Sequence, residues 1–193
     1  MTQLFVGGQP AVDFLNTAYA EGIETLGDGR ALLDWLVGAG LIDSAEANRL
    51  SRRFGGKAWN CAAAEARKIR EWLREWLARW RERPDGDYST ELATLNRLMS
   101  RDAPRPEVAA GEDGLHIVER WNFASAESVI ALIARHVAAL ITEEQAELVK
   151  ACAGPNCTLW FVDRTKAHRR TFCSATGCGN RAKVAAFRQR QRE

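Results

Sequence analysis

The sequence predicts a mainly α-helical N-terminal domain followed by a small C-terminal zinc finger, and three observations lead to this fold class. Apolar residues recur at helical spacing through most of the first 149 positions. Four of the five cysteines form two equally spaced pairs within the last 42 residues. Basic residues are concentrated in that same segment. We therefore expect a helical domain over residues 1–149 and a finger over residues 150–193.

The charge is distributed unevenly along the chain. The 193 residues carry 27 basic and 25 acidic side chains, a net charge of +2. Residues 150–193 hold ten of the basic and two of the acidic groups, which leaves 17 and 23 for the first 149 residues. A segment of net charge +8 on a body of −6 indicates an anionic polymer as the partner of the C-terminal segment.

The apolar pattern and the first residues favour a cytoplasmic protein. No stretch reaches the roughly 18 to 20 apolar residues that a membrane-spanning helix requires. The segment 1–5 lacks the basic and apolar regions of a secretory signal. We therefore expect no membrane partner.

The first third of the chain contains signals for several helices. A short helix is expected over 10–17, because Pro10 is tolerated in a first helical turn. A second helix, with an apolar face over 32–37, is expected to stop at Gly38. A third is expected over 44–53, before two consecutive glycines.

The segment 58–83 has the clearest helical pattern. Its large apolar residues are spaced by three and four positions and share one stripe: Ile69, Trp72, Leu73, Trp76, Leu77 and Trp80. We interpret this stripe as the core seam of a helical bundle rather than as a ligand box. Cys61, beside a run of alanines, is expected to be a small buried residue.

The segment 84–150 is predicted to hold two more helices and a hairpin. Ser89 to Ser100 reads as a helix, and 108–118 reads as a small β-hairpin around Gly111 and Gly114. A long apolar helix is expected to start at a Ser125 cap and to continue, or to restart at Thr142, as far as about Lys150.

The four C-terminal cysteines predict one structural zinc ion. Cys152 and Cys157 are separated by four residues, as are Cys173 and Cys178. Each spacing allows a turn that directs two sulfurs to one centre, and four thiolates suit tetrahedral Zn²⁺. An iron–sulfur centre and unrelated thiols are the alternatives. His168 is expected to face solvent or a phosphate, because four sulfurs already complete the coordination.

The metal also accounts for the folding of a segment with few apolar residues. Residues 159–162 predict one short strand, and a basic helix is expected to start near Cys178. Val184 and Phe187 are expected to face the zinc core from that helix. A segment of this size needs the binding free energy of the metal in order to fold.

Basic side chains of the finger predict binding to DNA, and duplex DNA is favoured over RNA. The expected contacts are Arg164, Lys166, Arg169, Arg170, Arg181, Lys183, Arg188 and Arg190, with Arg192 beyond them. Neutralising five to eight phosphates would give a salt slope of roughly −5 to −7. Some of these cations are expected to serve the zinc centre instead. A solvated tail and a finger that binds a protein partner are the alternative interpretations.

The finger resembles the CGNR-type zinc finger that ends a group of bacterial proteins. The matching residues are Cys152-x4-Cys157, Trp160-Phe161-Val162-Asp163, Arg169-Arg170, Cys173-Ser174 and Cys178-Gly179-Asn180-Arg181-Ala182-Lys183. Residues 12–17 and 32–36 resemble the ABATE domain that precedes this finger. The sequence departs from the family pattern at Phe172, where Trp is common, and at Ala175, where Met is frequent. The resemblance implies a stress-induced transcription regulator.

The N-terminal domain is a candidate for sensing or dimerisation. Asp13, Asn16 and Thr17 lie about one helical turn apart and could line an effector pocket with Trp35. Asp13 and Asn16 could instead cap or brace the Gly7-Gly8 loop. No catalytic motif stands out, so we expect no enzyme. A helical enzyme with an incidental metal site is the alternative, and it would enclose a polar pocket around Asp13 and Asn16. Because one finger contacts few base pairs, specific binding requires a dimer or a cooperating protein, and we expect a homodimer.

Overall fold

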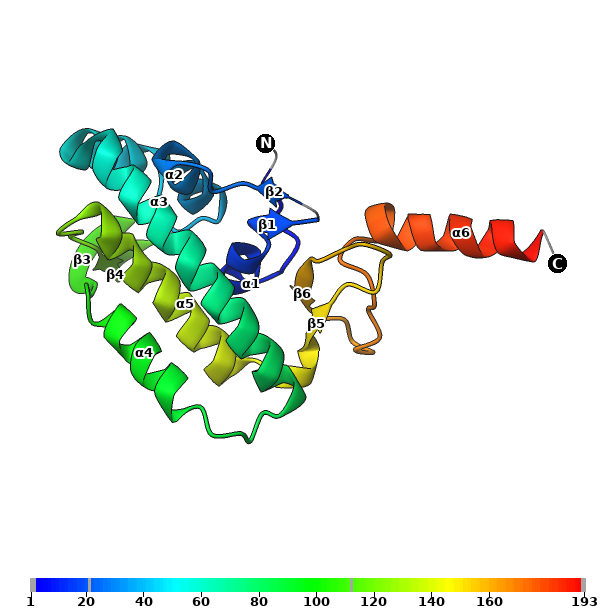
Figure 1. The fold of residues 1–193 in the computed structure, drawn as a ribbon. Coiled ribbons are helices and arrows are strands. Elements are labelled where there is room, and N and C mark those ends of the chain that lie inside the picture. Colours follow the sequence, from blue (N-terminus) through cyan, green and yellow to red (C-terminus); the bar gives the residue numbers. More distant parts are fainter. Residues whose placement is uncertain (1–2, 21, 112, 192–193) are drawn as a thin grey trace.

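The computed structural model of the protein describes residues 3–20, 22–111 and 113–191. An elongated helical body is followed by a small finger and a projecting last helix (Figure 1). The helices are α1 (Pro10–Leu15), α2 (Gly29–Gly38), α3 (Ser44–Glu82), α4 (Ser89–Met99), α5 (Val129–Glu143) and α6 (Asn180–Arg190). Antiparallel pairs are formed by β1 (Ala18–Tyr19) with β2 (Ile23–Glu24), β3 (Arg105–Gly111) with β4 (Gly114–Arg120), and β5 (Val149–Ala151) with β6 (Trp160–Val162).

The long helix α3 is the central element of the body and contains one kink. Gly55 has φ 73° and ψ 164°, a non-helical conformation that glycine adopts without a steric penalty. The kink divides α3 at the position where the sequence predicts the end of one helix. Pro10 begins α1 as expected, and α2 ends at Gly38 as expected.

The predicted apolar seam of α3 forms the core of the body. Leu73, Trp76, Leu77 and Trp80 are buried together, while Ile69 and Trp72 pack against the same cluster from its margin. The expectation for Cys61 was wrong, because its side chain is exposed. Cys61 directly precedes the buried Ala62 and Ala63 and lies on the solvent side of the helix.

The helix α5 supplies the second large apolar surface and ends earlier than the sequence predicts. A 3₁₀ turn (Ala126–Ser128) precedes it, and its buried side chains run from Val129 to Leu140. The chain becomes extended at Glu144 and forms strand β5, so the expectation of a helix to Lys150 was wrong. Val149 is fully buried and pairs with Val162 of β6, and this pairing explains why the helix stops.

The β3–β4 hairpin confirms the predicted hairpin and extends it at both ends. Its register pairs Val108 with Ile117 and Ala110 with Leu115. It lies at the end of the body away from the finger (Figure 1). Within the described ranges, no helix has both the length and the apolar character needed to cross a bilayer.

Candidate metal centre

The four C-terminal cysteines converge on one point. Their sulfurs all lie within 4.8 Å of one another. The Cys157 and Cys173 Sγ atoms are 3.8 Å apart, and the Cys173 and Cys178 Sγ atoms are 3.7 Å apart. A tetrahedral zinc ion with Zn–S bonds near 2.3 Å separates its sulfurs by about 3.8 Å. The sulfur positions therefore fit one Zn²⁺ ion.

Two tight turns carry the cysteine pairs. In the first, Cys157 N–H donates to the Gly154 carbonyl at 3.1 Å, and Asn156 takes a positive φ of 58°. A Cβ atom on Gly154 would lie 2.9 Å from the Cys178 sulfur, so only glycine lets the backbone pass this close to the centre. In the second turn, Gly179 N–H donates to the Ser174 carbonyl at 2.9 Å.

Several N–H groups point at the sulfurs and offset their negative charge. The backbone N–H groups of Gly154 and Cys173 donate to the Cys152 sulfur at 3.4 and 3.2 Å. The Arg181 guanidinium donates to the Cys178 sulfur at 2.9 Å. Because Zn²⁺ with four thiolates has a net charge of −2, these donors are the stabilising contacts that such a centre requires.

Without the metal, the thiols of Cys152, Cys157 and Cys173 differ in the direction in which their pKa is shifted. Burial raises the pKa of Cys157 to about 11, and burial together with the neighbouring sulfurs raises the pKa of Cys173 further. Burial also opposes ionisation of Cys152, but the N–H groups of Cys173 and Gly154 outweigh it and lower the pKa of that thiol. Zinc must therefore displace protons from this cluster when it binds.

Comparison with protein families agrees with this geometry. Residues 8–144 match the ABATE family model, described as "Putative stress-induced transcription regulator", and residues 149–191 match the CGNR zinc finger. The chain belongs to the ABATE family. As in the CGNR finger, its four clustered cysteines hold one structural Zn²⁺. No curated protein matches the chain.

The ABATE segment and the CGNR finger are joined through strand β6. The Asn16 side chain donates to the Trp160 carbonyl and accepts from the Trp160 N–H, both at 2.8 Å. The Val162 N–H donates to the Gly7 carbonyl at 2.8 Å. Trp160 and Val162 belong to the core of the body, whereas Phe161 between them packs on the buried cysteines. Alternate residues of one strand therefore serve the two cores.

Asp163 organises the loop that follows β6. Its carboxylate accepts from Lys150 Nζ at 2.6 Å, from Thr165 Oγ1 at 2.6 Å and from the Arg170 N–H at 2.9 Å. Burial opposes its ionisation, but these donors hold its pKa below the ordinary range. The sequence analysis did not predict that Asp163 holds this loop. The sequence did contain a signal for it, because an acidic residue directly follows an apolar strand in a basic segment.

Three of the predicted DNA-contacting residues are used within the protein. Arg170 donates to the carbonyls of Phe172 and Cys173, and its guanidinium lies 4.2 Å from the centre of the Phe161 ring. Arg181 binds the Cys178 sulfur, and Arg164 pairs with Glu144 at the end of α5. Arg181 thus contacts one of the clustered sulfurs directly, and Arg170 holds the backbone beside Cys173.

The other predicted cations are exposed and have no acidic partner in the described part of the chain. They are Lys166, Arg169, Lys183, Arg188 and Arg190. Arg192 lies outside the described residues. The expectation that Val184 and Phe187 face the zinc core was wrong, since 41% and 57% of their surfaces are exposed. The helix α6 leads away from the finger and buries none of its side chains (Figure 1).

The four residues of the suggested effector pocket have internal roles. Asp13 accepts from the Gly7 N–H at 2.7 Å, and Asn16 bonds to Trp160 as described. The Thr17 hydroxyl donates to the Phe14 carbonyl at 2.7 Å, and Trp35 is buried with its ring 5.4 Å from that of Phe14. All four are buried. Asp13 contacts the Gly7-Gly8 loop through Gly7, whereas Asn16 contacts strand β6 instead.

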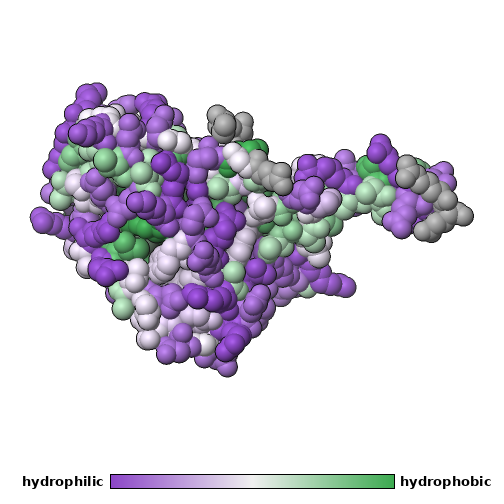
Figure 2. Space-filling model, in the orientation of Figure 1, coloured by the Kyte–Doolittle hydropathy of each residue, from purple (hydrophilic) through white to green (hydrophobic). Residues whose placement is uncertain are grey.

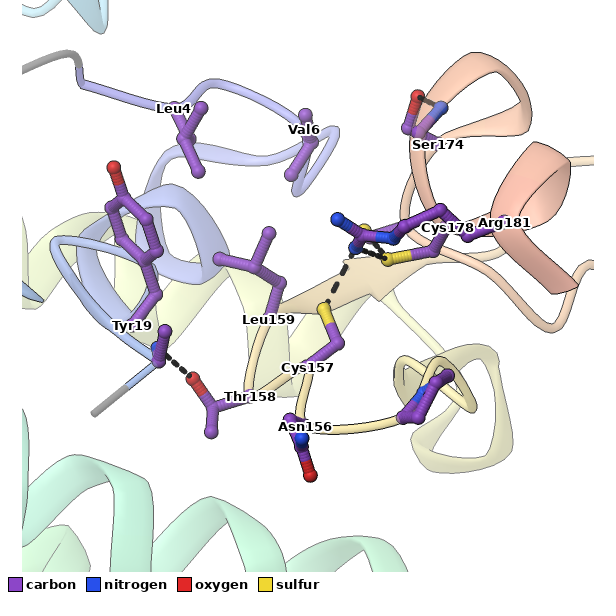
Figure 3. A pocket seen from close by; sticks show the side chains of 14 residues that line it. Leu4, Val6, Tyr19, Asn156, Cys157, Thr158, Leu159, Ser174, Cys178 and Arg181 are labelled. Carbon is purple, nitrogen blue, oxygen red and sulfur yellow. Dashed lines mark hydrogen bonds between the residues drawn. The ribbon is translucent and has the colours of Figure 1, made fainter.

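An open groove of about 640 Å³ lies elsewhere, beside the metal centre. Figure 3 shows Leu4, Val6 and Tyr19 of the N-terminal segment along one side of the groove and Leu159 on its floor. Arg181 lies at the other end, next to the Cys178 sulfur. The groove therefore contacts both the ABATE segment and the first turn of α6.

Proposed function

We propose that this protein regulates transcription by binding duplex DNA through its finger and α6. The proposal rests on five exposed basic side chains, which lie on α6 and in the loop 164–170. None of them forms an ion pair with an acidic residue in the described part of the chain. The acidic side chain of the described finger, Asp163, is buried and used by Lys150. The field around the finger is therefore positive, as phosphate binding requires.

The contacts within the finger refine the expected salt dependence. Arg164, Arg170 and Arg181 already have partners in the protein, which leaves five cations for phosphates. Five released counterions correspond to a slope of about −4 to −5 in log K against log salt. This slope is shallower than the one expected when all eight predicted residues bind phosphates.

Fluorescence anisotropy with a random-sequence duplex tests this proposal. Replacing Lys183, Arg188 and Arg190 by alanine should reduce the slope by about three, because each residue accounts for about one counterion. The matched control removes three exposed cations from the body, Arg52, Lys57 and Lys68, and should leave the slope unchanged. Absence of binding by the zinc-loaded parent at about 50 mM salt would contradict the proposal.

One observation favours a second candidate, a zinc-stabilised module that binds a protein. Val184 and Phe187 are three residues apart on α6 and form an exposed apolar pair. Figure 2 shows the projecting helix as mostly hydrophilic with a small hydrophobic area. Phe187→Ala separates the two candidates: it should leave the affinity for random duplex nearly unchanged if phosphates are the ligand, whereas it would abolish binding of a protein that docks on this pair.

We also propose that the protein receives a regulatory signal in the groove between its N-terminal segment and the finger, and that it forms a homodimer. The groove beside the finger supports an effector site for a small, mainly apolar molecule, because Leu4, Val6 and Leu159 line it. An effector bound there would touch Arg181 and so reach the start of α6. A thermal-shift screen of apolar compounds, repeated with Val6→Trp to fill the groove, tests this: a stabilising compound should lose its effect in the variant.

A further inference from the structure

The exposed side chains of α6 follow an ordered pattern around the helix. Uncharged residues recur at spacings of four, three and four positions and therefore share one face: Asn180, Val184, Phe187 and Gln191. We name these four residues the α6 stripe. Two amides lie at its ends, and two apolar side chains lie at its centre. All four are exposed, so the stripe is open to a ligand along the whole helix.

Basic side chains border the α6 stripe on both edges. At about 100° per residue, Lys183 and Arg190 lie along one edge and Arg188 lies along the other. None of the three has an acidic partner in the described part of the chain. Arg181 shares the edge of Arg188 but is held by the Cys178 sulfur. The face opposite the stripe carries only small or uncharged residues: Ala182, Ala185, Ala186 and Gln189.

We propose that α6 lies in the major groove of duplex DNA and reads base pairs through the α6 stripe. This inference deepens the DNA binding proposed above and rests on it. The major groove is about 12 Å wide, admits an α-helix and is bordered by the two phosphate backbones. When the stripe faces the base edges, Lys183 and Arg190 point to one backbone and Arg188 points to the other. The charges on the two edges of the stripe therefore complement the two walls of the groove.

The shape of the molecule leaves α6 free to enter the groove. The helix projects from the finger and buries none of its side chains (Figure 1). Its 11 residues have a length of about 16 Å at a rise of about 1.5 Å per residue. At about 3.4 Å per base pair, this length spans four or five pairs of the duplex. The stripe can thus contact a short block of sequence.

The chemistry of the α6 stripe selects A·T base pairs. Asparagine and glutamine amides bond to the N6 and N7 atoms of adenine, and apolar side chains contact the C5-methyl group of thymine. The amides of Asn180 and Gln191 have no hydrogen-bond partner in the described part of the chain. Val184 and Phe187 offer their exposed apolar surface to the methyl groups. Because the stripe itself contains no arginine or lysine, it lacks the residues that prefer guanine.

Selection of binding sites from random duplexes, followed by fluorescence anisotropy at about 150 mM salt, tests the inference with the zinc-loaded full chain. We expect enrichment of an A·T-rich block that binds at least tenfold more tightly than a scrambled duplex. Replacing the thymines of this block by uracil removes their methyl groups from the major groove and leaves the minor-groove edges unchanged. This replacement should weaken binding by the parent about tenfold.

Variants of the α6 stripe identify the residues that read the block. Val184→Ala combined with Phe187→Ala should weaken binding to the selected site about tenfold and should abolish the preference for thymine over uracil. Affinity for the scrambled duplex should stay within about twofold, because the cations remain. Gln191→Ala and Gln189→Ala remove the same amide from opposite faces of α6, and only Gln191→Ala should weaken binding to the selected site. Circular dichroism and zinc content verify that each variant is folded.

The outcomes separate this inference from the DNA binding on which it rests. A zinc-loaded parent that binds no duplex overturns both proposals. A parent that binds every duplex equally leaves the proposed function intact and overturns base reading by α6. An enriched site that binds equally well with uracil, or equal effects of Gln189→Ala and Gln191→Ala, likewise overturns the assignment of the α6 stripe.

Discussion

The helical body and the finger are stabilised in different ways. The body buries large side chains from α1, α2, α3, α4 and α5 in one apolar core. The finger has a small cluster made of Cys152, Leu159, Phe161, Cys173 and Cys178, in which three of the five buried residues are metal ligands. Burial of apolar surface stabilises the body, whereas the finger depends on the binding free energy of zinc.

The largest expected effect is the loss of one zinc ligand. In Cys178→Ser, the finger should unfold because three remaining thiolates hold zinc weakly, while the body keeps its helices. Limited trypsin digestion followed by mass spectrometry should show rapid cleavage at Arg169 and Lys183 and slow cleavage within α3. The control Cys61→Ser removes a thiol that is exposed on the body and should digest like the parent. Equal protection of the finger in Cys178→Ser would contradict the comparison.

A cavity in the body should produce the next largest effect. Leu73 is buried in the seam of α3, and Leu73→Ala should lower the free energy of unfolding by about 2–5 kcal/mol. Urea denaturation followed by tryptophan fluorescence measures this change. Below the transition, the variant should still hold one zinc per chain, because the substitution leaves the ligands in place. Loss of zinc before the body unfolds would show that the two regions are not stabilised separately.

The connection between the two regions gives a smaller effect. Asn16→Ala removes two hydrogen bonds and leaves the N–H and the carbonyl of Trp160 without that partner. Each buried group left unsatisfied costs about 1–3 kcal/mol. We expect amide exchange to accelerate at β6 and in the loop 163–170, with little change in α3. Thr17→Val, which removes a hydroxyl from a neighbouring position of the body, should leave exchange at β6 unaltered.

The sequence predicts the helical body and the finger with different success. Helical periodicity predicts the α3 seam because each apolar residue there packs against the body alone. It fails after Glu143, where pairing between Val149 and Val162 overrides the local preference for a helix. Cysteine spacing predicts the ligand cluster, but it carries no information on where α6 points. The exposure of Val184 and Phe187 depends on the orientation of the whole helix, which no local pattern encodes.

Contacts between distant residues were the least accessible to sequence reasoning. Asn16 and Trp160 are separated by 144 positions, and nothing in either neighbourhood indicates their pairing. The roles of Asp163 and Arg170 likewise require the loop to be folded. Sequence motifs therefore predicted which residues are important in the finger more readily than what each of them contacts.

The smallest expected effect is a change in pH dependence. Burial raises the pKa of Asp13 from 3.8 to about 6. Between these two values the folded state retains a proton that the unfolded state has released, so stability falls as pH rises from about 4 to 6. Asp13→Asn should remove this contribution and raise the melting temperature relative to the parent more at pH 7 than at pH 5. Because both proteins carry the same finger, the difference between their melting temperatures cancels the effect of pH on zinc binding. A difference that is the same at the two pH values would contradict the assignment.

The central claim is that a single metal ion organises the finger on a body that folds without it. Amide NMR spectra of the parent during titration with a zinc chelator, with released zinc quantified in the same samples, test this most directly. We predict release of one zinc per chain, loss of the dispersed signals of residues 152–157 and 163–179, and retention of the α3 and α5 signals. Retention of the finger signals after complete zinc removal, or simultaneous collapse of the body, would contradict the account.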